Sequence, residues 1–315
     1  MDPFPSSPLI RPADAAGVAE AARRLQAGQL VAVPTETVYG LAARADRAEA
    51  VAAIYRAKGR PDFNPLIVHV ASIEQAEALA VLDERAHLLA RHFWPGPLTM
   101  VLPLREGAAI APAVTAGLPT IAIRMPAHPV MRAVLSQSGL PLAAPSANRS
   151  GGVSPTEAGH VARSLGDAAG MVLDGGACAK GLESTIAALR ADGSWQLLRP
   201  GPITEGEIAA LLGPSEAITE AKVEAPGQLA GHYAPGKPVR LNANEAMPDE
   251  FLIGFGDISG DCTLSESGDL AEAAARLYAC LHAGAVASQP RIAIAPIGEQ
   301  GIGAAINDRL RRAAA

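Results

Sequence analysis

Apolar and polar positions divide most of the chain into alternating strands and helices. Short, continuous apolar runs such as 30–34 (LVAVP) and 66–71 (LIVHVA) are typical of strands buried on both faces. Residues 14–27 and 47–58 instead space their apolar positions as an amphipathic helix does. The alternation continues to residue 213 and predicts an α/β fold. Further strands are expected at 98–104, 120–125, 142–145, 171–174, 184–189 and 195–200, and further helices at 73–81, 83–93, 128–138, 156–165 and 204–212.

The periodicity stops after residue 213. Residues 214–237 are rich in Ala, Glu, Gly and Pro and are too long for an ordinary loop, so we interpret them as a linker. A second, smaller α/β unit is expected over 238–315, after a first domain of residues 1–213. Its strands are predicted at 239–241, 251–255 and 291–297, and its helices at 269–282 and 302–312.

Composition narrows the class of protein. The 315 residues are 49% hydrophobic and 18% charged, which is typical of a globular protein. The sequence contains neither a long uncharged apolar stretch nor an N-terminal secretory signal, so we expect no membrane span. Its three cysteines form no CxxC and its seven histidines no HExxH, which predicts no disulfide framework and no transition-metal site. These observations favour a reducing, cytoplasmic location.

Charge argues against nucleic acid as the main partner. The net charge is −6, and residues 1–213 are nearly neutral, with 18 basic against 19 acidic residues. No long basic face for a duplex is therefore expected. Only four of the 26 basic residues are lysines, which draws attention to Lys58 because it lies inside a motif.

The first candidate motif is PTETVYGLA at 34–42, directly after a predicted strand. Its threonine and tyrosine hydroxyls suit a small polar ligand. The alternative is the start of a helix, with Thr35 as N-cap and Glu36 in the first turn.

The second motif, AKGRPDFNPL at 57–66, places Lys58 and Arg60 two residues apart. In an extended segment the two cations would point the same way and match a polyphosphate. Pro61 supports the extended interpretation because it disfavours helical geometry at Arg60. The alternative is a basic helix C-terminus interacting with the helix dipole.

Two polar residues lie in predicted buried strands. His69 is either an ordinary core histidine or a ligand-binding one. Arg124 ends its strand and must be paired, either with a substrate carboxylate or with an internal Asp or Glu.

Gly-rich segments follow several strands. APSANRSGGVSP at 144–155 allows close approach of backbone amides to phosphate or sugar, although alone it is only a turn-rich loop. A second such loop, at 174–186, ends at Glu183-Ser184-Thr185, and Arg199 lies at a strand end. GFGDISG at 254–260 has the wrong spacing for a dinucleotide site and is interpreted as a turn.

Together these motifs resemble the YrdC-like family of threonylcarbamoyl-AMP synthases, in its two-domain form. PTETVYGL, Lys58-x-Arg60 with NPLIVH, WPGPLT, TAGLPTIAIRMPAHP, APSAN, GLESTI and LLRPGP occur in the family's order, and HYAP and GIGAAINDRL extend the resemblance almost to the C-terminus. The resemblance implies a twisted mixed α/β sheet with a concave cavity and a small Rossmann-like C-terminal domain. It also implies an active-site lid formed by residues 214–237.

The resemblance further implies roles for individual residues. Around threonine it places Thr37, His69, Arg124, Ala144 and Ser184, with Arg124 pairing the carboxylate. Around ATP it places Lys58, Arg60, Asn64, Thr120, Ser146, Asn148, Ser154, Arg199 and the lid residue Tyr233, with Lys58 and Arg60 stabilising charge on the phosphates.

The implied reaction joins L-threonine, bicarbonate and ATP into threonylcarbamoyl-AMP and pyrophosphate, with Mg²⁺ carried by ATP and no protein metal site. The product would pass to a tRNA threonylcarbamoyl-transferase complex. Two alternatives are an RNA-binding module, since such domains have a concave surface that accommodates RNA, and a carbamoyl-phosphate-dependent transferase. The low aromatic content and the absence of a CxxC region argue against them as main functions.

Overall fold

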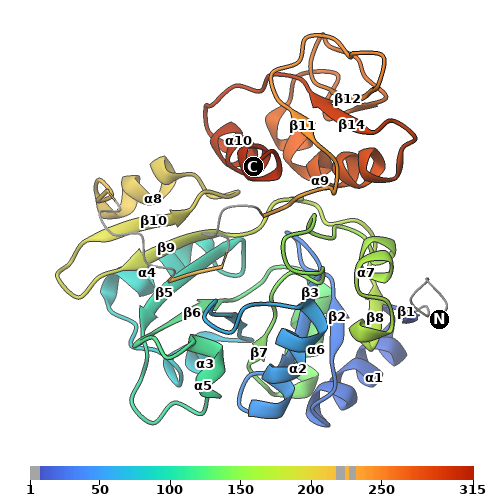
Figure 1. Cartoon of the computed structure of the whole chain (residues 1–315). Helices are drawn as coiled ribbons and strands as arrows, with labels where there is room; N and C mark the ends of the chain where they lie inside the picture. Colours follow the sequence, from blue (N-terminus) through green and yellow to red (C-terminus); the bar gives the residue numbers. More distant parts are fainter. Residues whose placement is uncertain (1–7, 218–223, 227–231) are drawn as a thin grey trace.

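The computed structural model describes residues 8–217, 224–226 and 232–315, and these build two β-sheets covered by helices (Figure 1). Ten strands form a twisted mixed sheet in the order β1-β8-β2-β3-β7-β4-β6-β5-β9-β10. The strands are β1 Leu9–Pro12, β2 Val31–Val33, β3 Gly40–Arg44, β4 Ile67–His69, β5 Leu98–Pro103, β6 Thr120–Arg124, β7 Leu142–Ala143, β8 Met171–Asp174, β9 Thr185–Leu189 and β10 Trp195–Arg199.

Four parallel strands form the second, smaller sheet in the order β11-β14-β12-β13. It lies beyond the linker, above the large sheet in the view of Figure 1. Its strands are β11 Val239–Arg240, β12 Glu250–Gly254, β13 Cys262–Thr263 and β14 Arg291–Ile294.

The helices follow the predicted apolar spacing. In α1 the buried face is Val18, Ala21, Ala22 and Leu25, and the Asp14 carboxylate caps the helix by accepting from the Gly17 amide at 2.8 Å. The helices are α1 Ala15–Gln26, α2 Ala48–Lys58, α3 Ile73–Glu77, α4 Glu84–Phe93, α5 Pro112–Thr115, α6 Pro129–Ser138, α7 Ala158–Leu165, α8 Glu205–Leu212, α9 Leu270–Val286 and α10 Ile302–Ala313, with a 3₁₀ turn at Gly166–Ala169. Among the described residues, no helix is long and apolar enough to cross a bilayer.

Most predicted elements are confirmed, and the differences have local causes. The helix start at Thr35 is wrong, because residues 35–39 are not helical and strand β3 follows them. Strand β1 was not expected since proline-rich sequence flanks it. The predicted absence of disulfides is wrong for Cys262 and Cys280, which are bonded with their Cα atoms 5.9 Å apart. Cys178 is a buried free thiol. Part of the predicted linker, 218–223 and 227–231, lies outside the described residues.

One face of the large sheet borders a cavity that holds several of the predicted site residues. Apolar side chains from β4, β5, β6, β9 and β10 meet on this face, and the linker residue Ala225 packs onto them. Side chains alternate between the faces of a strand, so Thr120, Ala122 and Arg124 of β6 share it. The cavity lies where β4, β6 and β10 end and β9 begins.

Candidate active site

A cavity with about 520 Å³ of empty space, part of it open to solvent, lies at these strand ends of the large sheet. Eleven of its seventeen lining residues carry a polar or charged side chain, and they come from strand ends, loops and the linker. Nine of the residues that the sequence singled out line it: Thr37, Arg60, His69, Arg124, Ala144, Ser146, Ser184, Arg199 and Tyr233. Five others do not belong to its lining: Lys58, Asn64, Thr120, Asn148 and Ser154.

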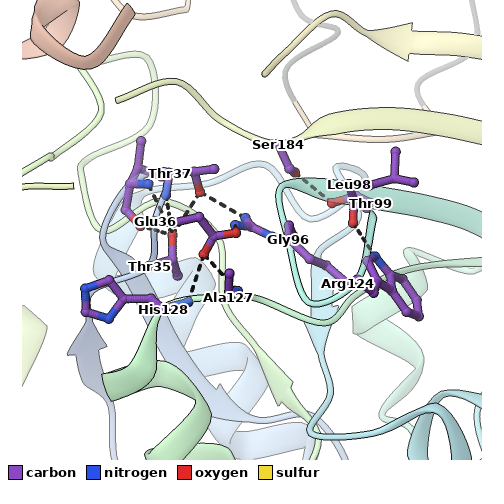
Figure 2. Close-up of polar contacts among 12 residues, drawn as sticks. Thr35, Glu36, Thr37, Gly96, Leu98, Thr99, Arg124, Ala127, His128 and Ser184 are labelled. Atoms are coloured by element: carbon purple, nitrogen blue, oxygen red, sulfur yellow. Dashed lines mark hydrogen bonds and ion pairs between the residues drawn. The ribbon is translucent and has the colours of Figure 1, made fainter. Parts of the chain in front are cut away.

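The segment between β2 and β3 brings hydroxyl groups to the cavity (Figure 2). Thr35 Oγ lies 2.8 Å from Thr37 Oγ and donates to the Val38 carbonyl at 2.6 Å. Both threonines are buried. The Thr35 hydroxyl also accepts from the Thr37 and Val38 amides, so the turn that presents Thr37 is held by its own side chains.

Arg124 is paired inside the protein. Its guanidinium donates to Glu36 Oε1 at 2.5 Å, to Thr37 Oγ at 2.9 Å and to the Gly96 carbonyl at 3.1 Å (Figure 2). Of the two partners left open by the sequence, the internal acid is therefore present. Among the described residues these bonds use three of the five guanidinium N–H donors, and two remain beside the cavity.

The Glu36 carboxylate that pairs with Arg124 is itself held by the backbone. Its second oxygen accepts from the backbone amides of Ala127 at 3.1 Å and His128 at 3.3 Å. Burial would raise the pKa of Glu36, but the charge and hydrogen bond of Arg124 outweigh burial and lower it. The carboxylate is thus ionised, and the pair is neutral as a whole.

His69 ends strand β4 on the same wall and is 3% exposed. Burial, with Arg124 nearby, lowers its pKa to about 3, so the imidazole is neutral near pH 7. Its Nδ1 has no hydrogen-bond partner among the described residues. Because buried polar atoms are seldom left unpaired, this atom is a candidate ligand contact.

Lys58 and Arg60 are not arranged as predicted. Lys58 is the last residue of helix α2, and Gly59 caps the helix with a φ of 59°, so the extended Lys58-x-Arg60 interpretation is wrong. The Lys58 ammonium donates to the carbonyls of Ser146 and Asn148, both at 2.5 Å. The helix end is therefore tied to the 144–155 loop.

Arg60 does face the cavity. It donates to the carbonyls of Asn64 at 3.2 Å and Pro65 at 2.9 Å and makes no ion pair with any described residue. Burial lowers its pKa to about 10. Among the described residues, its guanidinium is therefore bonded to backbone carbonyls and to no carboxylate.

Arg199 also lines the cavity and joins three segments of the chain. Its guanidinium donates to the Ser184 carbonyl at 3.0 Å and hydroxyl at 3.1 Å, and to the Pro226 carbonyl of the linker at 3.3 Å. Thr99 Oγ lies 2.7 Å from Ser184 Oγ. The Arg199 side chain of β10 thus joins the loop before β9 to the linker.

The remaining predicted residues surround the cavity at a greater distance. Asn64 and Asn148 each carry a buried side-chain oxygen without a hydrogen-bond partner among the described residues. Ser154 donates to Glu183 at 2.5 Å. Thr120 begins β6, about 13 Å along the strand from Arg124, which ends it.

Two family models match different parts of the chain. The family model described as "Telomere recombination", which covers the Sua5, YciO and YrdC proteins, matches residues 23–201. The model described as "Threonylcarbamoyl-AMP synthase, C-terminal domain" matches residues 203–315. A threonylcarbamoyl-AMP synthase from Pyrococcus abyssi is 39% identical over 321 residues, covering 93% of this chain and 92% of that protein.

This chain belongs to the threonylcarbamoyl-AMP synthase family. A Bacillus subtilis member is 48% identical over 230 residues, which is 71% of this chain and 66% of that relative. The crystal structure of P. abyssi Sua5 complexed with L-threonine has a TM-score of 0.86 and 36% identity, and covers 98% of this chain and 97% of that one.

Three residues at the candidate site were given no ligand role by the sequence analysis. Glu36 neutralises Arg124, Glu183 lines the cavity, and His232 lines it with a buried Nδ1 that has no hydrogen-bond partner in the described part of the chain. Glu36 and Glu183 each lie next to a predicted ligand residue, Thr37 and Ser184. The sequence signal for Glu36 was an acid inside a hydroxyl-rich motif. Its partner Arg124 lies 88 residues away, so only the fold identifies the pair.

Proposed function

We propose that this chain, as an enzyme of the threonylcarbamoyl-AMP synthase family, condenses L-threonine, bicarbonate and MgATP into threonylcarbamoyl-AMP and pyrophosphate. This would be the first step in forming N⁶-threonylcarbamoyladenosine in tRNAs that read ANN codons. The observation that carries the proposal is one cavity with two kinds of cation. Arg124 is neutralised by Glu36, whereas Arg60 has no acidic partner among the described residues.

The Arg124 wall would hold L-threonine. A zwitterion suits a wall with no net charge, where the free N–H groups of Arg124 bind the carboxylate and neutral His69 is available for a polar contact. We propose that Thr37, Ala144 and Ser184 complete this part. The L-threonine complex of the related Sua5 supports the assignment.

The Arg60 wall would hold ATP. An unneutralised guanidinium suits polyphosphate, and Arg199 provides a second buried cation nearby. The unpaired side-chain oxygens of Asn64 and Asn148 need donors, which the ribose hydroxyls and the adenine amino group have. We propose that Lys58, Thr120, Ser146, Ser154 and Tyr233 complete the ATP site.

The chemistry would proceed by positioning and charge stabilisation. The deprotonated threonine amine forms a bond to the carbon of CO2 derived from bicarbonate, and a proton is released. An oxygen of the resulting carbamate attacks the α-phosphorus of ATP, and the bond to the β-phosphate oxygen breaks to release pyrophosphate. Arg60 and Lys58 would stabilise the charge that develops on the phosphates.

Mg²⁺ would enter as part of the substrate MgATP. Among the described residues there is no group of three or more His, Cys, Asp or Glu side chains that could hold a metal ion. No step is assigned to the ion.

We further propose that residues 214–237 act as a lid between a catalytic domain of 1–213 and a Rossmann-like domain of 238–315. The four parallel strands of the second sheet support the Rossmann-like assignment. A lid has a purpose because the mixed anhydride product hydrolyses readily. We also propose a cytoplasmic location, where the Cys262–Cys280 bond would be reduced. The product would be handed to a tRNA threonylcarbamoyl-transferase complex, and any RNA binding by the chain would be weak.

The experiment is to incubate the purified chain with MgATP, bicarbonate and L-threonine in the cold and separate nucleotides by rapid chromatography. The proposal expects an adenylate and pyrophosphate that both require threonine and bicarbonate. Omission of each substrate in turn is the control. ATP that is bound but left intact under all conditions contradicts the proposal.

A further inference from the structure

Three loops of the first unit insert an apolar side chain into the core of the second. Val38, Val153 and Leu182 pack in the same buried cluster as Tyr278, Leu281 and Ile306. Val38 follows Thr37 and Val153 precedes Ser154, both residues of the proposed site, and Leu182 precedes Glu183, which lines the cavity. The second unit therefore touches the site loops themselves.

The contact at the third loop has no spare room. Gly181 adopts a φ of +66°, and a Cβ added there would meet the Ala274 carbonyl oxygen and the Ala275 Cα of helix α9, each at 2.4 Å. The loop backbone thus lies directly on α9 just before Glu183. Because no side chain fits between them, a shift of α9 would shift the loop.

From the residues that the structure describes, Glu183 receives three hydrogen bonds, two of them from the second unit. Its Oε2 accepts from Tyr278 Oη at 2.7 Å and from Arg309 Nε at 2.9 Å. Its Oε1 accepts from Ser154 Oγ at 2.5 Å. Glu183 is 6% exposed, and Tyr278 and Arg309 are not exposed at all. Helices α9 and α10 thereby fix a carboxylate that lines the cavity.

The same two residues also hold Tyr233. Its ring stacks on Tyr278 at 5.6 Å between centroids, and Arg309 Cζ lies 5.4 Å from the centroid on the Tyr233 ring. Arg309 further donates to the Pro200 carbonyl at 3.0 Å, next to Arg199. One guanidinium therefore contacts Glu183, Tyr233 and the end of strand β10.

Of the two residues that hold Glu183, Arg309 matters more because it carries the charge that balances the carboxylate. Burial would raise the pKa of Glu183, but Arg309 and then Arg199 lower it to about 2. Without Arg309, a buried carboxylate would lose its direct ion-pair partner, which is costly. Glu183 would then protonate or move, and Ser154 and Ser184 would move with it.

We propose that Arg309 and Tyr278 are positioning residues of the synthase reaction, so that the C-terminal unit shapes the substrate cavity by holding Glu183 and Tyr233. They do not line the cavity and take no part in bond making. The inference rests on the proposed function, because it names how that site is held in shape.

The test compares Arg309→Met, Arg309→Lys and Tyr278→Phe with the wild-type chain. The control is Arg311→Met, two residues further along α10. The Arg311 side chain is 59% exposed. KM for L-threonine and MgATP, kcat, and amide hydrogen exchange of 151–156 and 181–185 are measured. Tyr278→Phe keeps the ring and removes only the hydroxyl, so it should fold even if Arg309→Met does not.

A misplaced site raises KM, whereas a smaller folded fraction lowers only the apparent kcat. We expect Arg309→Met to raise both KM values about 10-fold and to speed exchange in the two loops, with Arg309→Lys in between. Tyr278→Phe should raise them about 3-fold. Wild-type KM values and loop exchange in Tyr278→Phe and in every folded Arg309 variant would overturn the inference. If the wild-type chain forms no adenylate, the proposed function fails, and loop exchange alone still decides whether these residues hold the loops.

Discussion

The Arg124 wall and the Arg60 wall differ in how their charge is balanced. Arg124 is bonded to Glu36, which also accepts two backbone amides, so its charge is cancelled before any ligand binds. Within the described part of the chain, Arg60 donates to two carbonyls and to no carboxylate, and so does the nearby Lys58. One wall is therefore nearly neutral and the other positive.

This difference teaches how one cavity can separate two substrates. An amino acid carries both charges and gains little from a net field, whereas a polyphosphate gains from every unneutralised cation. Burying these positive charges is unfavourable, since burial lowers the pKa of Arg60 in the wall and of Lys58 at the end of α2. Four changes can break or sharpen the comparison.

The largest expected effect is that of Glu36→Gln, which makes the neutral wall positive. Breaking a buried ion pair from one side should lower the free energy of unfolding by about 3 kcal/mol, because Arg124 is left buried without its anion. Denaturant unfolding measures this. Glu20→Gln is the control, since Glu20 forms an ion pair at the exposed surface with Arg24. A loss no larger than that of the control would contradict the pairing.

Arg60→Ala should remove the main cation of the positive wall. If Arg60 stabilises charge on the phosphates, the rate of adenylate formation should fall at least ~10²-fold. Initial-rate measurements at saturating L-threonine test this, with Arg56→Ala on the exposed part of α2 as control. Near-wild-type turnover in Arg60→Ala would contradict its role.

Acid should destabilise the folded chain partly through His69. Its pKa is about 3 when folded and about 6.5 when unfolded, so between these values the unfolded state binds a proton that the folded state excludes. Stability should fall as the pH drops below 6.5, by about 2 kcal/mol at pH 5 for this one group.

His69→Gln should remove that share of the pH dependence, while the same change at exposed His92 should not. Unfolding curves from pH 7 to 5 provide the measurement. An unchanged slope in His69→Gln would show that His69 is not held neutral.

The smallest expected effect is that of Asn64→Ala. Its buried Oδ1 has no partner among the described residues, so the substitution removes no internal hydrogen bond at that atom. We expect the stability of the free chain to change by less than about 0.5 kcal/mol, and the affinity for MgATP to fall about 10-fold. Differential scanning fluorimetry with and without MgATP separates the two. An equal shift in both conditions would contradict ligand binding by Asn64.

Much of this arrangement could be predicted because its signals are local. Apolar runs predicted the strands that carry His69, Arg124 and Arg199, and strand ends placed these side chains at one edge. The order of the motifs also indicated the family. The local pattern gave the wrong conformation at Lys58. We predicted an extended segment there, but Lys58 is the last residue of α2, and Gly59 in the left-handed conformation ends the helix.

Long-range pairing could not be predicted in the same way. Glu36 meets Arg124 across 88 residues, and Glu183 meets Arg309 across 126. A lone acid in a loop does not indicate which cation will neutralise it, because the partner is selected by the packing of the two units. The role of the C-terminal unit at the site therefore became visible only in the fold.

The most direct test of two walls for two ligands is calorimetric titration of L-threonine and, separately, MgATP into the wild-type, Arg60→Ala and Thr37→Val chains. The account predicts that Arg60→Ala loses affinity for MgATP and keeps it for L-threonine, and that Thr37→Val does the reverse. Equal losses of both ligands in both variants would contradict the division of the cavity.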